Sequence, residues 1–168
     1  MIEPDTLREM QRPLKERYRD DPDAALVTLH AEGSIGLDGI TCSVQTSKAL
    51  IEAGLHPATG GNGSAACSGD MLLEALVACA GVTLNAVASA LGVELRGGRV
   101  KAEGDLDFRG TLGIDREAAV GFQDIRLEFE LDSDADHETL DRLLKLTERY
   151  CVIYQTLKSP PEIEVARS

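Results

Sequence analysis

The stretch "SGDMLLEALVACAGVTLNAVASALG", residues 68–92, decides the fold of this chain. Its apolar residues predict a helix from Gly69 to Leu91, and Gly92 is the residue type that most often follows a helix. The predicted helix is apolar on nearly every side, with exceptions at Glu74, Asn85 and Ser89. A helix that is apolar on nearly every side is buried at the centre of a fold. Because 168 residues can hardly surround it, we expect a second subunit to cover part of it.

Strands are predicted on both sides of this central helix by alternating apolar and polar residues. The elements expected around it are a helix at 5–19, a β-hairpin at 25–47, a glycine-rich loop at 56–70, strands at 99–109 and 122–131, a helix that starts near 134 and runs to 157, and a closing strand at 162–167. Each long strand has one polar face, which is typical of an antiparallel sheet covered on one side. The order predicts an α+β fold in a single domain, residues 1–168, with 1–24 as an N-terminal helical extension.

The composition argues against nucleic-acid and membrane partners. The net charge is −12, and an acidic surface of this kind repels phosphate backbones and anionic lipids. The N-terminal stretch "MIEPDTLREMQRPLKERYRD" has charges throughout and no apolar signal core. The longest strongly apolar run, 75–84, is short of the roughly 20 residues that cross a bilayer. We therefore expect a cytoplasmic protein, in which thiols stay reduced.

Four cysteines, at positions 42, 67, 79 and 151, are too few for a disulfide scaffold. There is no C-x-x-C pair and the three histidines are scattered, so we expect neither a metal site nor a cofactor. Cys42 lies on the inward face of the predicted hairpin and is most simply a core residue. Cys67 precedes the central helix, where backbone N–H groups lower a thiol's pKa, so it is either an ordinary loop cysteine or a reactive one.

Cys79 and Cys151 each lie on the apolar face of a predicted helix. Taken separately, each reads more simply as core filler, because burial in apolar surroundings raises a thiol's pKa. Cys79 is also too far inside its helix for the helix dipole to make the thiol acidic. A reactive Cys79 would therefore need a nearby cation to stabilise the thiolate.

The surrounding motifs change this interpretation. The segments "LLEALVAC", residues 72–79, and "YCVIYQTL", residues 150–157, resemble the two cysteine motifs of the OsmC/Ohr family (osmotically induced and organic hydroperoxide resistance proteins). The order of elements agrees over residues 25–166. The resemblance implies an intertwined homodimer, with antiparallel sheets around two central helices and two sites at the interface.

The resemblance also implies a chemistry for oxidative stress, with Cys79 as the peroxidatic and Cys151 as the resolving cysteine. Cys79 would attack an organic hydroperoxide to give sulfenic acid, Cys151 would close a disulfide, and an external dithiol would reduce it. Cys67 is an alternative resolving thiol. A non-catalytic dimer that binds a small hydrophobic ligand in an interface pocket is the other function the sequence leaves open.

The chain departs from the family at the residues that activate the thiol. The family uses an arginine from the N-terminal hairpin, held by a glutamate ten residues before the peroxidatic cysteine. That glutamate position is Gly69 here, with Asp70 beside it, and no arginine occurs between Arg19 and Arg96. Lys48, just after the second hairpin strand, is the expected substitute cation, with Asp70 to orient it. Val152 replaces the family's proline after the resolving cysteine, so the last helix is expected to run through Cys151.

Overall fold

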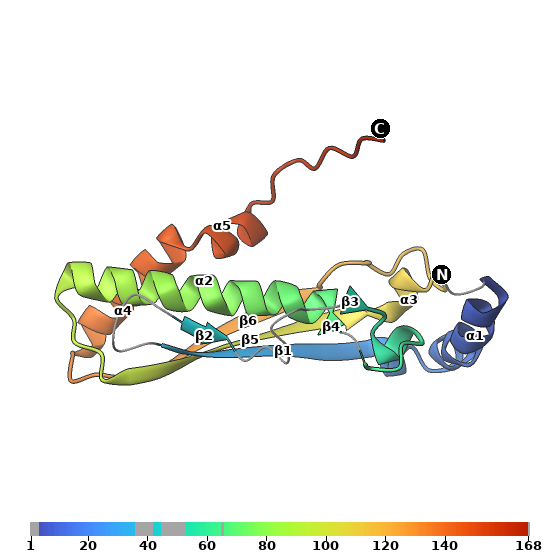
Figure 1. Cartoon of the computed structure of the whole chain (residues 1–168), viewed down its shortest axis with the longest axis horizontal. Coiled ribbons are helices and arrows are strands. Elements are labelled where there is room, and N and C mark those ends of the chain that lie inside the picture. The colour runs from blue at the N-terminus through green and yellow to red at the C-terminus, as the bar shows by residue number, and fades with distance from the viewer. Residues whose placement is uncertain (1–3, 36–41, 45–52, 65, 168) are drawn as a thin grey trace. The chain divides into compact units, whose positions relative to one another are not determined.

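The computed structural model describes residues 4–35, 42–44, 53–64 and 66–167 (Figure 1). The helices are α1 (Pro4–Asp20), α2 (Ser68–Leu91), the short α3 (Phe108–Thr111), α4 (His137–Tyr150) and α5 (Val152–Lys158), with 3-10 turns η1 (Pro22–Ala25) and η2 (Pro57–Thr59). The strands are β1 (Leu26–Ile35), β2 (Cys42–Val44), β3 (Ala53–Gly54), β4 (Ala66–Cys67), β5 (Gly97–Asp107) and β6 (Asp124–Asp132). The mixed α+β content is the one that the sequence predicts.

The main sheet has four strands in the order β2-β1-β5-β6. β1 and β2 form the predicted antiparallel hairpin, in the register that pairs Ile35 with Cys42. The amide of Arg96 donates to the Asp132 carbonyl and that of Gln123 to the Asp105 carbonyl, so β5 and β6 also run antiparallel. Exposure alternates along β6 residue by residue, which confirms a sheet with one wet face. A separate pair, β3 with β4, is parallel.

The central helix α2 has the predicted extent. Gly92 follows it with φ of 68°, and the Val93 amide donates to the Ala88 carbonyl at 2.9 Å, as in a Schellman end. By length and apolar composition α2 would be able to cross a membrane. Its fully buried face makes it instead a core helix; the residues of that face are Leu73, Leu76, Val77, Ala80 and Leu84.

An exposed stripe also runs along α2, at helical spacing of three and four residues. Its members are Leu72, Ala75, Cys79, Val82, Ala86 and Ala90. Leu72 and Val82 are 36% and 38% exposed, and Cys79 between them is half-buried. The structure therefore confirms that α2 has no strongly polar face, and it shows which apolar side chains stay uncovered in one chain.

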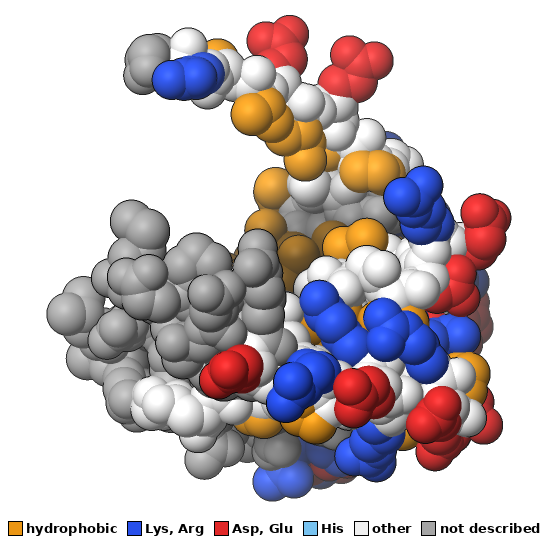
Figure 2. Space-filling model, turned by 90° about the vertical axis from the view of Figure 1, so that its right-hand side faces the viewer, with side chains coloured by type: hydrophobic (Ala, Val, Ile, Leu, Met, Phe, Trp, Pro, Cys, Tyr) orange, Lys and Arg blue, Asp and Glu red, His pale blue; other side chains and the backbone are white. Residues whose placement is uncertain are grey.

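The chain divides into two compact units, which are described separately. The first unit comprises residues 1–31, 45–74 and 101–128, and the second comprises 32–44, 75–100 and 129–168. In the first, Tyr18 of α1 is buried with Phe108, and its hydroxyl donates to the Ala58 carbonyl at 2.8 Å. Figure 2 shows Lys and Arg side chains, with acidic ones between them, gathered on the face where Figure 1 places α1.

Two predictions for the C-terminal part are wrong. The last helix does not run through Cys151: α4 ends at Tyr150, Cys151 has extended backbone, and α5 begins at Val152. Residues 160–167 form no strand, and Ile163 and Val165 are 84% and 94% exposed. Their alternation fits a strand, but among the described residues no neighbouring strand completes the hydrogen bonds of this segment.

Candidate functional site

The candidate site lies in the second unit, where Cys79 and Cys151 come together. Cys79 sits near the middle of α2, on its half-exposed stripe. Cys151 is only 1% exposed and occupies the break between α4 and α5. Its amide donates to the Thr147 carbonyl and its carbonyl accepts from the Gln155 amide, both at 2.9 Å. The bend between the helices therefore fixes the backbone that carries the second thiol.

Hydrogen bonds make Cys79 the more acidic thiol of the pair. Burial raises its pKa, but donors that point at its sulfur outweigh that effect and the pKa of Cys79 lies below its usual range. The donors, in order of effect, are the Ile153 amide, the Cys151 thiol, the Thr83 hydroxyl and the Val152 amide. Each stabilises the charged form of sulfur, so the Cys79 thiol ionises more readily than an ordinary cysteine.

The partner thiol shifts in the opposite direction. Burial is the main cause that raises the pKa of Cys151 to about 11, and the neighbouring Cys79 sulfur raises it further. The Tyr154 and Ile153 amides oppose this shift without reversing it. At neutral pH, therefore, Cys151 keeps its proton and donates a hydrogen bond to the Cys79 sulfur. The arrangement places a thiol of lowered pKa in contact with a thiol of raised pKa.

The sequence analysis predicts that a cation is needed to lower the pKa of Cys79, whereas in the structure hydrogen-bond donors lower it. Thr83 lies one turn after Cys79 on α2, so the four-residue spacing in the sequence indicates a hydroxyl close to the Cys79 sulfur. The sequence does not indicate the Val152 and Ile153 amides as donors, because these amides become available only through the helix break at Cys151. Among the residues that the structure describes, no cation contributes to the lowered pKa of Cys79.

The other predicted site residues are not among the described residues of the second unit. Lys48 is outside the described residues, so its role stays a prediction. Cys67 and Asp70 belong to the first unit: Cys67 is half-buried in β4, and Asp70 is in the first turn of α2. Burial raises the pKa of Glu74, one turn on, and the negative charge of Asp70 raises it further. Neither Cys67 nor Asp70 is among the groups that shift the Cys79 pKa.

Cys67 lines an apolar groove of about 360 Å³ within the first unit, beside Leu72 and Phe108. The ring of Phe108 stacks on His56 there, with 5.0 Å between ring centroids. Cys42 belongs to β2, but its side chain lies outside the described part of the structure. Within the described ranges, no group of three or more His, Cys, Asp or Glu side chains is placed to hold a metal ion.

A second apolar groove adjoins the cysteine pair in the second unit. It has a volume of about 470 Å³ and is lined by residues of α2 and α4, among them Val82, Thr83, Ala86, Leu146 and Tyr150. Val82 and Thr83 follow Cys79 by three and four positions on the same helix, so the groove begins one turn from the sulfur. Its lining suits an alkyl or aryl group.

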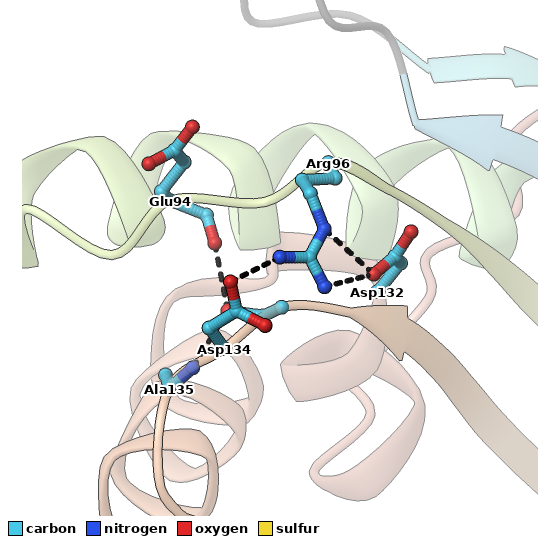
Figure 3. A network of polar contacts seen from close by, with 6 residues as sticks. Glu94, Arg96, Asp132, Asp134 and Ala135 are labelled. Carbon is cyan, nitrogen blue, oxygen red and sulfur yellow. Dashed lines mark hydrogen bonds and ion pairs between the residues drawn. The ribbon is translucent and has the colours of Figure 1, made fainter.

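A polar network anchors the strand ends that lead into α4 (Figure 3). The Arg96 guanidinium donates to the Asp132 carboxylate, at 2.7 Å from Nη2, and also to Asp134. The Ser133 hydroxyl donates to the Glu94 carbonyl at 2.7 Å and accepts from the Ala135 amide. These bonds join the start of β5 to the end of β6, just before the helix whose far end carries Cys151.

Comparisons with known proteins agree with this architecture. A family model described as OsmC-like protein matches residues 61–166. A solved OsmC-like hydroperoxide resistance protein from Jannaschia sp. CCS1 superposes with a TM-score of 0.59 at 17% identity, over 83% of this chain and 91% of that one. An OsmC-like protein from Mycoplasma pneumoniae gives 0.56 at 16% identity, over 80% and 86%. No curated protein matches the sequence. At these identities the structural likeness shows the fold alone.

Proposed function

The chain belongs to the OsmC-like protein family, and from that membership we propose that it is a thiol peroxidase that reduces organic hydroperoxides. Cys79 is the attacking thiolate and Cys151 the resolving thiol. The observation that carries the proposal is the hydrogen bond between these two sulfurs, with the pKa of Cys79 lowered and that of Cys151 raised. The Cys79 thiol is thereby prepared to attack the peroxide, while the Cys151 thiol remains available to form the disulfide.

In the first step the Cys79 thiolate attacks the outer oxygen of the hydroperoxide. The O–O bond breaks, Cys79 becomes a sulfenic acid, and the alcohol leaves. In the second step Cys151 attacks the sulfenic sulfur, and the two cysteines form a disulfide with loss of water. An external dithiol then restores both thiols by exchange. Sulfur supplies both electrons, so the cycle needs no metal or cofactor.

The groove next to Cys79 supports an organic rather than an inorganic peroxide as substrate. Its apolar lining from α2 and α4 would hold the hydrocarbon part of the molecule. Hydrogen peroxide has no such part, so it would gain nothing from the groove. We expect cumene hydroperoxide to react faster than hydrogen peroxide for this reason.

A homodimer completes the proposal. The exposed stripe of α2 is apolar and includes Cys79, which is only half-buried in one chain. A second copy packed on this stripe would bury it and would bound the pocket around the sulfur. Exclusion of water also strengthens the hydrogen bonds that hold the thiolate.

The second candidate function is a dimer that binds a small hydrophobic ligand without chemistry. The absence of the family glutamate at Gly69, together with the groove of about 470 Å³, favours it. Binding would then survive the loss of Cys79. Cumene, which lacks the peroxide group, would bind the wild type and Cys79→Ser equally in calorimetry, and neither protein would consume peroxide.

The test is peroxide consumption with dithiothreitol as reductant. We expect the wild type to turn over cumene hydroperoxide and Cys79→Ser to be inactive. In a separate reaction without reductant, Cys151→Ser should consume one equivalent of peroxide and keep a sulfenic acid on Cys79, which dimedone traps and mass spectrometry locates. A wild type that leaves the peroxide intact would eliminate the peroxidase function.

A further inference from the structure

We propose that Cys151 has a second catalytic role, as the acid that protonates the leaving alkoxide when Cys79 attacks the hydroperoxide. This inference rests on the proposed peroxidase function and deepens it. The family's arginine is missing from the hairpin sequence, so the leaving oxygen needs another source of positive charge or of a proton. The Cys151 thiol lies in hydrogen-bond contact with the reacting sulfur and carries a proton.

The geometry singles out Cys151 among the donors around Cys79. Thr83 donates through a hydroxyl, and Val152 and Ile153 donate through backbone amides. Both kinds of group are far weaker acids than a thiol, so they stabilise charge but do not give up a proton. Cys151 is 1% exposed, so water does not compete for its proton before the peroxide arrives. It is therefore the one thiol proton held against the reacting sulfur within the described residues.

The Cys79 thiolate forms a bond to the outer peroxide oxygen, which keeps its hydrogen, and the O–O bond breaks. The bonding pair leaves with the alkyl oxygen, which takes the proton from the Cys151 sulfur and departs as alcohol. Cys79 is oxidised to sulfenic acid, the peroxide is reduced, and Cys151 is left as a thiolate. That thiolate then attacks the sulfenic sulfur and displaces hydroxide, which water protonates.

This order of steps explains how Cys151, a thiol of raised pKa, becomes a nucleophile at neutral pH. A pKa of about 11 leaves Cys151 almost entirely protonated, and a protonated thiol does not attack sulfenic acid. An alkoxide is the conjugate base of an acid about as weak as water, so transfer of the thiol proton to it is strongly favourable. The first step thus generates the thiolate that the second step requires, and only after Cys79 has been oxidised.

The experiment compares two oxidants with different leaving groups in Cys151→Ala. Cumene hydroperoxide expels an alkoxide and needs an acid. Peracetic acid expels a carboxylate, whose conjugate acid has a pKa of roughly 4, and needs none. The measurement is consumption of the first equivalent of oxidant in quenched flow without reductant. We expect the variant to slow cumene hydroperoxide about 100-fold more than peracetic acid, within the range typical of general acid catalysis.

The ratio of the two rates separates this role from others. Loss of thiolate in the variant slows both oxidants alike, so it leaves the ratio unchanged. Leu143→Val, which removes one carbon from an equally buried position on α4, controls for packing and should keep the wild-type ratio. Cys151→Ser, with a hydroxyl that is a poor acid, should behave like the alanine variant.

Two outcomes overturn the inference and leave the peroxidase proposal intact. In the first, Cys151→Ala keeps the wild-type ratio of the rates with cumene hydroperoxide and peracetic acid. In the second, Leu143→Val changes this ratio as much as Cys151→Ala does. Failure of the proposed function looks different, because the wild type itself then leaves cumene hydroperoxide unreacted.

Discussion

At the scale of single residues, one hydrogen bond between Cys79 and Cys151 organises the site. The proton stays on Cys151 because that sulfur is buried, while Cys79 receives several donors at once. Hydrogen bonds to a charged group contribute more than those between neutral groups, typically about 1.5–3 kcal/mol each. A set of such bonds can replace much of what a single arginine provides in acidifying a thiol.

The Thr83 hydroxyl is the donor that a single substitution removes most cleanly. Thr83→Val keeps the side-chain shape and deletes the hydrogen bond to the Cys79 sulfur. We expect the Cys79 alkylation pKa to rise by about 1–2 units, since a unit corresponds to 1.36 kcal/mol. The pH dependence of iodoacetamide labelling, followed by mass spectrometry of the Cys79 peptide, measures it.

Thr147→Val is the matched control for that experiment. Thr147 is a buried helical threonine, and its hydroxyl donates to the Leu143 carbonyl of its own helix at 2.9 Å. Thr147→Val should leave the pKa of Cys79 unchanged. An unchanged value in Thr83→Val as well would mean that the hydroxyl does not stabilise the thiolate.

The raised pKa of Cys151 predicts a loss of stability in alkali. The unfolded chain releases this proton near pH 8.5, whereas the folded chain keeps it until about 11. Between these values the unfolded state binds fewer protons, so stability falls as pH rises. Urea unfolding of the reduced protein at pH 8 and pH 10 should show a larger drop for the wild type than for Cys151→Ala. Equal drops would refute the assigned direction.

Sequence alone was sufficient to identify the cysteine pair as the candidate site, but not the way the pair is activated. Cys79 and Cys151 stand inside two motifs with recognisable neighbours. The donors to Cys79 are partly backbone amides from a distant segment, and an amide has no sequence signature. The sequence points to Lys48 only if a cation is needed to acidify Cys79, and the donors from Thr83 and Ile153 reduce that need.

At the scale of elements, the break between α4 and α5 matters most for the site. Cys151 has φ of −72° and ψ of 108°, so the first amides of α5 are free to point toward Cys79. Helical periodicity continues through this point and neither Gly nor Pro marks it, which is why the break was not predicted. Tertiary contacts of the buried Cys151 override the local preference.

Val152→Pro tests the role of this break. Val152 is the first residue of α5, where proline is well tolerated, and extended Cys151 suits a residue before proline. The fold should persist by circular dichroism, while the Cys79 alkylation pKa should rise because one amide donor is lost. The rise should be smaller than in Thr83→Val, since Val152 is the weaker donor.

Val152→Ala serves as the comparison because it keeps the amide and should not shift the Cys79 pKa. If both substitutions give the wild-type value, the Val152 amide does not stabilise the thiolate.

Most helices and strands are predicted correctly from the local sequence pattern. The two wrong predictions, the helix through Cys151 and the closing strand, share one cause. The alternation in β5 and β6 and the apolar run of α2 are encoded where they occur, and so is Gly92 at the helix end. The segment 162–167 has the same alternation without becoming a strand. A strand depends on a neighbour as well as on its own residues, and no sequence pattern supplies the neighbour.

At the scale of the whole molecule, the uncovered stripe of α2 predicts a homodimer. We expect sedimentation to give a dimer at micromolar concentration, with roughly 2,000 Å² or more buried in total. Val82→Arg places a charge in the stripe and should shift the protein to monomers, since a buried unpaired charge is strongly unfavourable. Val120→Arg, at a 63% exposed position outside α2, is the control and should stay dimeric. A monomeric wild type would contradict the prediction.

The peroxidase account depends on one chemical event, the oxidation of Cys79 and Cys151 to a disulfide by an organic hydroperoxide. The most direct measurement treats the reduced protein with one equivalent of cumene hydroperoxide and maps its peptides without reduction. We expect a single intramolecular disulfide that joins the Cys79 peptide to the Cys151 peptide. Free thiols at both positions, or a disulfide between Cys79 and Cys67, would contradict it.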